Sequence, residues 1–226
     1  MLPISSRLNP SRISRRPLLG AIGVSALLGT VPAQAQSTPK PDKIAMDDLM
    51  AANALSDVVQ GGADAKVTII EYASMTCTHC ARFHQEVYPA LKAKYIDTNK
   101  IKFILREFPL DPLATAGFML ARCSGSDEKR TALVDIMFSQ QKSWAFVDKP
   151  IEALLNLTKQ AGFTQEAFET CLKDQSLYDN INKIRNRASE KFGIDATPTF
   201  YINGVRRSGE LSIDDLDKAI TPLLAP

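Results

Sequence analysis

The sequence has few of the residues that build metal centres, because its 226 residues include only two histidines and four cysteines. A structural zinc site usually shows two close pairs of such ligands. Here only Cys77 and Cys80 are close, whereas Cys123 and Cys171 lie 48 residues apart. The spacing therefore favours redox chemistry over a metal clamp, and we expect no metal and no other cofactor. The sequence also has no phosphate-binding loop and no internal repeat.

Long apolar runs are missing too. The stretch from Leu18 to Val31 has 14 residues, which is too short to span a bilayer comfortably. It follows four arginines and no acidic residue, and it precedes Ala33-Gln34-Ala35. This order of basic region, short apolar region and small-residue site is typical of a cleavable export signal. We predict a signal over residues 1–35, cleaved after Ala35; an N-terminal membrane anchor is the alternative.

The basic part of this segment points to a particular export route. Ser14-Arg15-Arg16-Pro17-Leu18-Leu19 resembles the twin-arginine motif of bacteria, although Leu18 stands where that motif usually has phenylalanine. Three glycines also make the apolar region less hydrophobic. We therefore expect twin-arginine export, in which the protein folds before it crosses the membrane. A strongly basic signal for the general secretory route is the alternative.

A large charge of either sign is also lacking, since 27 basic residues face 25 acidic ones. Cleavage after Ala35 would remove four arginines and no acid, which leaves 23 basic and 25 acidic residues. The remaining basic residues near the C-terminus are scattered through polar stretches, which is typical of solvated faces. We therefore expect no nucleic-acid partner.

What the sequence does have is a CxxC pair where a helix begins. Residues 67–73 are rich in β-branched side chains and predict a buried strand that carries one carboxylate, Glu71. Cys77-Thr78-His79-Cys80 follows, and apolar residues then recur at helical spacing up to Tyr95, with Pro89 expected to kink the helix. A cysteine at a helix N-terminus lies over unpaired N–H groups, which favour the thiolate. Such a pair is suited to disulfide exchange.

The remaining elements follow from periodicity and turn signals. Residues 101–108 predict a strand parallel to the first, and about 85 residues of helical periodicity follow. A hairpin of strands 199–202 and 205–208 turns at Asn203-Gly204, and Ser212 begins a last helix. In the middle stretch we expect helices that start near Asp111, Ser126, Asp148 and Thr164, and a longer helix over 177–192. The last helix of the chain has an apolar face formed by Ile213, Leu216, Ile220 and Leu223.

An ordered set of motifs resembles the DsbA family of thioredoxin-fold thiol:disulfide oxidoreductases. The set consists of Glu71-Tyr72-Ala73-Ser74, the CxxC with His79, the helical insert, and Thr197-Pro198-Thr199-Phe200 followed by Ile202-Asn203-Gly204. The resemblance implies an α/β thioredoxin-like fold of order β-α-β, helical insertion, β-β-α. It places a thioredoxin-like domain at 57–108 and 193–226, the insertion at 109–192, and an N-terminal extension at 36–56.

The resemblance also assigns roles around the CxxC pair. Cys77 is the exposed sulfur that a substrate thiolate attacks, Cys80 is less exposed, and His79 supplies a donor or partial positive charge near the Cys77 sulfur. Glu71 matches the buried acid of the family and could exchange a proton with Cys80; a salt-bridged carboxylate at a strand edge is the alternative. His79 could instead simply face solvent. The sequence marks His84, four residues after Cys80, as more often structural than catalytic.

Two further features follow from the family. Pro198 is implied to be cis, and the backbone of Thr197 is implied to pair with an extended substrate chain.

Cys123 and Cys171 fall on the apolar faces of predicted helices, where they form either a structural disulfide or two buried thiols. We favour the disulfide in an oxidising compartment.

Three functions remain open at this point. The first is a periplasmic, monomeric oxidase that gives its Cys77–Cys80 disulfide to reduced or unfolded exported proteins and is reoxidised by a DsbB-like, quinone-linked membrane partner. The second is an isomerase or reductase on the same scaffold, since Thr78 replaces the proline of well-known oxidases and isomerases often carry threonine where Thr197 stands. The third is a non-catalytic chaperone or metal carrier.

Overall fold

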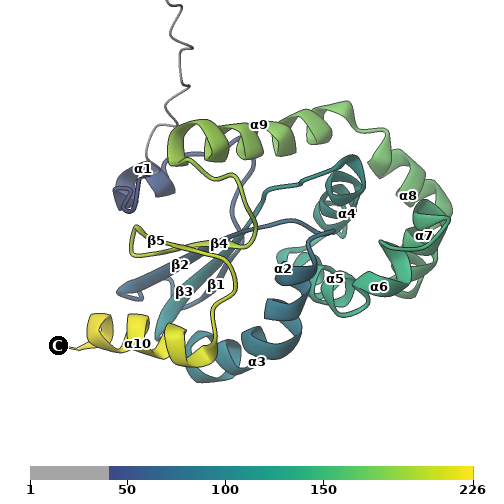
Figure 1. Cartoon of the computed structure of the whole chain (residues 1–226). Coiled ribbons are helices and arrows are strands. Elements are labelled where there is room, and N and C mark those ends of the chain that lie inside the picture. The colour runs from purple at the N-terminus through teal and green to yellow at the C-terminus, as the bar shows by residue number, and fades with distance from the viewer. Residues whose placement is uncertain (1–40, 226) are drawn as a thin grey trace, which may run out of the picture. The chain divides into compact units, whose positions relative to one another are not determined.

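The computed structural model describes residues 41–225, which lie within one compact unit formed by residues 39–226. The predicted export signal, its twin-arginine motif and the cleavage site after Ala35 lie outside the described residues. Within the described part, a five-stranded sheet has the order β1-β3-β2-β4-β5 (Figure 1). Its strands are β1 (Val59–Gly61), β2 (Val67–Ala73), β3 (Ile101–Glu107), β4 (Thr199–Ile202) and β5 (Val205–Ser208).

The central strand β2 is buried along its whole length, which explains its continuous run of apolar residues. It pairs in parallel with β3 and antiparallel with β4. Because side chains alternate along a strand, Ile69 and Ala73 contribute to one apolar core, and Ile70 and Tyr72 contribute to the other. Glu71 therefore projects to the same side as Ile69 and Ala73, the side on which the helix of the CxxC pair packs.

Helices cover both faces of this sheet. In Figure 1, α10 (Ile213–Leu224) and α3 (Tyr88–Leu91) lie below the sheet, and α1 (Met46–Met50) and α9 (Gln175–Phe192) lie above it. The first strand β1 runs antiparallel to the edge of β3. The helix α1 and the strand β1 both precede Gly62. The thioredoxin-like α/β fold class is confirmed.

The helix that begins at the CxxC pair is not a regular α-helix. It consists of α2 (Thr78–Arg82), the wide π-type turn η1 (Phe83–Val87), α3, and a second wide turn η2 (Lys92–Ile96). Pro89 lies in the first turn of α3, where its missing N–H leaves no bond to break. A π segment lies just before Pro89, which periodicity alone did not indicate, and the kink at Pro89 stays a prediction.

The insertion between β3 and β4 is entirely helical, as predicted. Asp111, Ser126 and Thr164 each cap a helix with a side-chain oxygen that accepts a backbone N–H bond. The start near Asp148 is wrong by two residues, because the helix begins at Pro150. The short helix α6 was not predicted. The insertion helices are α4 (Pro112–Arg122), α5 (Asp127–Ser139), α6 (Gln141–Trp144), α7 (Pro150–Gln160), α8 (Gln165–Leu172) and α9.

The C-terminal hairpin turns at Asn203-Gly204, as predicted. Gly204 has φ of +83°, and a Cβ there would lie 2.2 Å from the carbonyl oxygen of Ile44, so only glycine fits this close approach. After the hairpin, Ser212 forms the predicted capping box of α10. Leu223, which we placed on the apolar face of this helix, is exposed, whereas its neighbour Leu224 packs against the core.

Candidate active site

Cys77 is the N-cap residue of α2, and its sulfur faces the first turn of that helix. The Cys77 Sγ accepts a hydrogen bond from the backbone N–H of Cys80 at 3.4 Å. On its other side it lies 3.3 Å from the carbonyl oxygen of Thr197, to which the thiol donates. Cys77 is 8% exposed and Cys80 is fully buried. A substrate can therefore reach only Cys77, although the Thr197 loop covers it more than the sequence suggested.

The surroundings of Cys77 favour its thiolate. Its pKa is lowered to about 5, chiefly because the Cys80 thiol donates a hydrogen bond to the sulfur. Burial opposes this effect, whereas the Thr197 side chain and the backbone N–H groups of Cys80 and His79 add to it. The N-terminal turn of α2 thus supplies the donors that its position in the sequence predicted.

Cys80 is affected in the opposite direction. Burial raises the pKa of the Cys80 thiol well above its ordinary value, and the hydrogen bond to Cys77 and the negative charge of Glu71 raise it further. The pair is therefore asymmetric: one sulfur holds a negative charge easily and the other holds a proton. The two sulfurs are not joined by a disulfide in this structure.

Glu71 lies on β2 and is completely buried. Its Oε2 is 2.9 Å from Nε2 of His84, and Oε1 has no hydrogen-bond partner among the described residues. Its neighbours across the sheet are apolar, Leu105 on β3 and Phe200 on β4. The acid is thus in the sheet interior, not at a strand edge. Its ion-pair partner is a histidine from the helix of the CxxC pair.

His79 lies elsewhere than the sequence suggested. Its side chain is 60% exposed and its Nδ1 pairs with the carboxylate of Glu210, which also binds Arg82 at 3.0 Å. The part of His79 that stabilises the Cys77 thiolate is its backbone N–H. The imidazole instead pairs with Glu210 and so joins the CxxC helix to the loop after β5.

The loop before β4 lies against the CxxC pair. The peptide bond between Thr197 and Pro198 is cis. The carbonyl of Thr197 faces the Cys77 sulfur, and the carbonyl of Pro198 accepts a bond from the N–H of Gly209 at 2.9 Å. Residues 120 positions apart in the chain, Cys77 and Thr197, thus meet at one site.

The insertion supplies two residues that sequence reasoning missed. Gln141 of α6 is buried, and its Nε2 donates to the carbonyl oxygens of Met75 at 2.8 Å and Cys77 at 2.9 Å. Asp111, the cap of α4, accepts a bond from the Thr76 hydroxyl at 2.5 Å. The sequence predicted Asp111 as a helix start, but it did not predict that Asp111 contacts the loop of Cys77. No motif in the sequence around Gln141 indicates a role at the site. Both residues fix the loop that carries Cys77.

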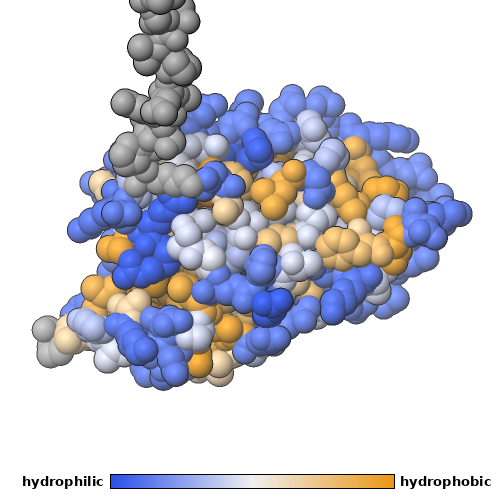
Figure 2. Space-filling model, in the orientation of Figure 1, coloured by the Kyte–Doolittle hydropathy of each residue, from blue (hydrophilic) through white to orange (hydrophobic). Residues whose placement is uncertain are grey.

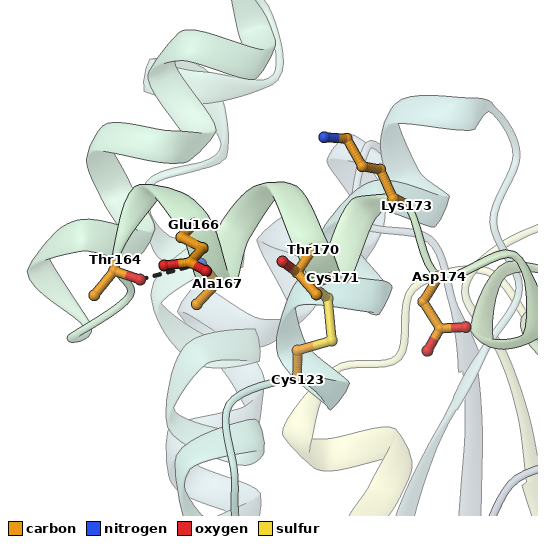
Figure 3. A pocket seen from close by; sticks show the side chains of 8 residues that line it. All are labelled: Cys123, Thr164, Glu166, Ala167, Thr170, Cys171, Lys173 and Asp174. Carbon is orange, nitrogen blue, oxygen red and sulfur yellow. Dashed lines mark hydrogen bonds between the residues drawn. A yellow bond between two sulfur atoms is a disulfide. The ribbon is translucent and has the colours of Figure 1, made fainter.

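The other two cysteines form a disulfide within the insertion. It joins the C-terminal end of α4 to α8, with 6.2 Å between the Cα atoms of Cys123 and Cys171. Cys171 is buried, whereas Cys123 is exposed, because it caps α4 instead of lying on its apolar face. An open cavity of about 810 Å³ lies beside this disulfide (Figure 3). Its walls include none of the residues that surround Cys77.

Two further observations concern the described residues 41–225 alone. Among them there is no group of three or more His, Cys, Asp or Glu side chains with the arrangement of a metal site. Nor does that part contain a helix that is both long and apolar enough to cross a membrane.

Comparisons with known proteins identify the family of this chain. The family model described as "Thioredoxin" matches residues 53–221. A candidate protein-disulfide oxidoreductase of Rickettsia felis is 34% identical over 201 residues, which cover 87% of this chain and 69% of that protein. A second one, from Rickettsia conorii, is 36% identical over 169 residues, covering 75% and 61%. The chain thus spans about two thirds of the length of these relatives.

A solved structure is similar over nearly its full length. The crystal structure of α-DsbA1 from Wolbachia pipientis superposes with a TM-score of 0.73 and 30% sequence identity, covering 79% of this chain and 96% of that one. The family resemblance predicted from the CxxC, Glu71 and Thr197-Pro198 motifs is confirmed. The chain belongs to the thioredoxin family, among its DsbA-like protein-disulfide oxidoreductases.

Proposed function

We propose that this protein is an oxidase that transfers its Cys77–Cys80 disulfide to cysteines of reduced, exported proteins. The observation that carries the proposal is the asymmetry of the pair: the pKa of Cys77 is lowered to about 5 and that of Cys80 is raised. A stabilised thiolate favours the reduced form, which makes the oxidised form a stronger oxidant.

The proposed reaction has two exchanges. A substrate thiolate attacks Sγ of Cys77, the Cys77–Cys80 bond breaks, and its electron pair moves to Cys80, which takes up a proton. A second substrate thiolate then attacks the substrate sulfur of the mixed disulfide, so that a substrate disulfide forms and Cys77 leaves as a thiolate. The substrate loses two electrons, and the CxxC pair gains them. The low pKa of Cys77 makes it a good leaving group in the second step.

The surface around the site supports an unfolded substrate. We propose that an extended chain pairs with the backbone of Thr197 in the manner of an added strand. Figure 2 shows apolar residues gathered in a band below α9, over the insertion helices. The large exposed apolar side chains of this insertion include Phe146, Val147 and Ile151. An exposed apolar surface of this kind can bind the apolar segments that an unfolded substrate has not yet buried.

The cellular setting is part of the same proposal. The export signal over residues 1–35 would deliver the protein to the periplasm, where disulfides persist. A quinone-linked membrane protein of the DsbB kind would restore the Cys77–Cys80 disulfide after each cycle. We propose that the protein acts as a monomer, which light scattering of the purified protein would test.

One experiment tests the direction of the reaction. Oxidised protein is mixed with a reduced, unfolded protein that has an even number of cysteines, and remaining thiols are counted. We expect one substrate disulfide for each Cys77–Cys80 disulfide consumed, and none with the Cys77→Ser variant. Substrate thiols that persist in the presence of the wild-type protein would refute the proposal. Rearrangement of scrambled substrate disulfides without net oxidation would instead favour the isomerase alternative, which Thr78 and Thr197 keep open.

A further inference from the structure

Three ionisable side chains from different elements lie next to one another, and the charge of the first, Glu71, acts on Cys80. Glu71 on β2 is paired with His84 on η1, with 2.9 Å between Oε2 and Nε2. On the other side of the ring, Nδ1 of His84 lies 3.7 Å from Oδ1 of Asp135 on α5. The first two are buried, and Asp135 is 41% exposed. The line thus runs from the interior to the surface.

The histidine ring is fixed in this position by aromatic neighbours. Phe138 of α5 stacks on it with 4.3 Å between ring centroids and an interplanar angle of 20°. Tyr88 of α3 lies against the ring at 4.8 Å. The ring therefore cannot turn without disturbing the core, and its two nitrogens face different carboxylates. Nε2 is hydrogen-bonded to Glu71, whereas Nδ1 has no hydrogen-bond partner among the described residues and faces the Asp135 charge at 3.7 Å.

Bulk water has little access to these groups. The cavity beside His84 and Asp135 has a volume of about 20 Å³, and a space of that size holds about one water molecule. Cys80 is itself fully buried. However, Cys80 must gain a proton each time the disulfide opens and lose it each time the disulfide forms. A proton source inside the protein is therefore needed.

We propose that His84 is this source, and that it exchanges a proton with Cys80 through Glu71 while Asp135 keeps His84 protonated. The inference rests on the proposed redox cycle. When the Cys77–Cys80 bond breaks, the Glu71 carboxylate accepts a proton from Nε2 of His84 and passes it to the Cys80 thiolate. In the dithiol form His84 regains a proton from solvent at the exposed Asp135, which agrees with its raised pKa in this structure, and reoxidation releases the Cys80 proton along the same line. No other reactant is needed, and His84 acts through Glu71 as a positioning residue.

The acid–base balance of the site agrees with this direction of transfer. Burial alone would lower the pKa of His84, but the charges of Glu71 and Asp135 raise it to about 9. At neutral pH His84 is therefore an imidazolium. The proton passes from it to a thiol whose pKa is raised further, which is the favourable direction. The other ionisable groups near the ring are Tyr88 and Arg130, and Arg130 is already paired with Glu107 at 2.8 Å.

The test follows the opening of the disulfide by reduced glutathione as a function of pH. Rates are divided by the ionised fraction of glutathione, so that only the protein's own titration remains. For the wild type we expect a rate that is level near pH 7 and falls through about pH 9, where His84 loses its proton. Asp135→Asn should move this fall to lower pH by about 1 to 2 units, because an opposite charge near the ring is lost. Asp135→Glu should restore it.

His84→Gln should react about 100-fold more slowly at pH 7, at the low end of general acid catalysis, and its rate should show no fall near pH 9. Asp64→Asn, at an exposed position, is the matched control and should behave as the wild type. If His84→Gln does not fold, the two Asp135 variants decide alone. A fall at the same pH in wild type and Asp135→Asn would overturn the inference. A wild type that fails to react at all would instead count against the proposed function.

Discussion

The Cys80 thiol is the largest single contributor to the low pKa of Cys77, and this can be tested by removing it. Cys80→Ala deletes the donor and keeps the backbone N–H groups of α2. A hydrogen bond to a charged group contributes about 1.5 to 3 kcal/mol, which corresponds to about 1 to 2 pH units. The pKa of Cys77 should therefore rise from about 5 by that amount in the alanine variant.

The assay is the pH dependence of Cys77 alkylation by iodoacetamide, and the midpoint of the profile is compared. At pH 6 the ionised fraction of Cys77 should fall from about 90% to roughly 25% for a rise of about 1.5 units. Cys80→Ser is the matched control, because its hydroxyl can still donate to the sulfur. It should keep a low midpoint. Equal midpoints in the two variants, or an alanine variant that still titrates near the wild-type value, would refute the reasoning.

Three further predictions concern stability. Glu107→Gln should destabilise the fold by about 3 kcal/mol in urea, because the buried Glu107 carboxylate forms ion pairs with two arginines. Burial opposes ionisation of Glu107, but the two arginines outweigh it and lower its pKa. The wild type should therefore lose stability as the pH falls through the pKa of Glu107 in the folded protein. The Glu107→Gln variant should lose less stability over the same pH range. Cys123→Ala/Cys171→Ala should lose about 4 kcal/mol, the chain entropy of a loop of 48 residues; an unchanged urea midpoint would contradict this. Gln141→Leu should cost about 1 to 3 kcal/mol in thermal unfolding, since two buried carbonyls lose their donor, and a variant as stable as wild type would argue against it.

Local patterns predicted most of the fold. The β-branched run of 67–73, the cap residues Ser126 and Thr164, and the Asn203-Gly204 turn each fixed an element to within about two residues. These features depend on neighbours within one or two turns of chain. The π segments at η1 and η2 were not predictable in this way, because they keep the same apolar face as an α-helix.

The site was predictable only in part, for a similar reason. The CxxC pair and Glu71 lie six residues apart and belong to one motif. Gln141 and Asp135 reach the site from 50 or more positions away, on helices of the insertion whose packing no local pattern describes. His79 shows the same limit, because its partner Glu210 lies 131 residues further along the chain.

The reduction potential of the Cys77–Cys80 pair is the most direct test of the central claim. At pH 7 a thiolate with a pKa of about 5 favours the reduced form by about 2.7 kcal/mol relative to an ordinary cysteine, or about 60 mV for two electrons. Equilibration with glutathione buffers measures the potential. An oxidase with this site should lie above about −200 mV, towards the DsbA end of the family range. A value near the roughly −270 mV of thioredoxin would contradict the account.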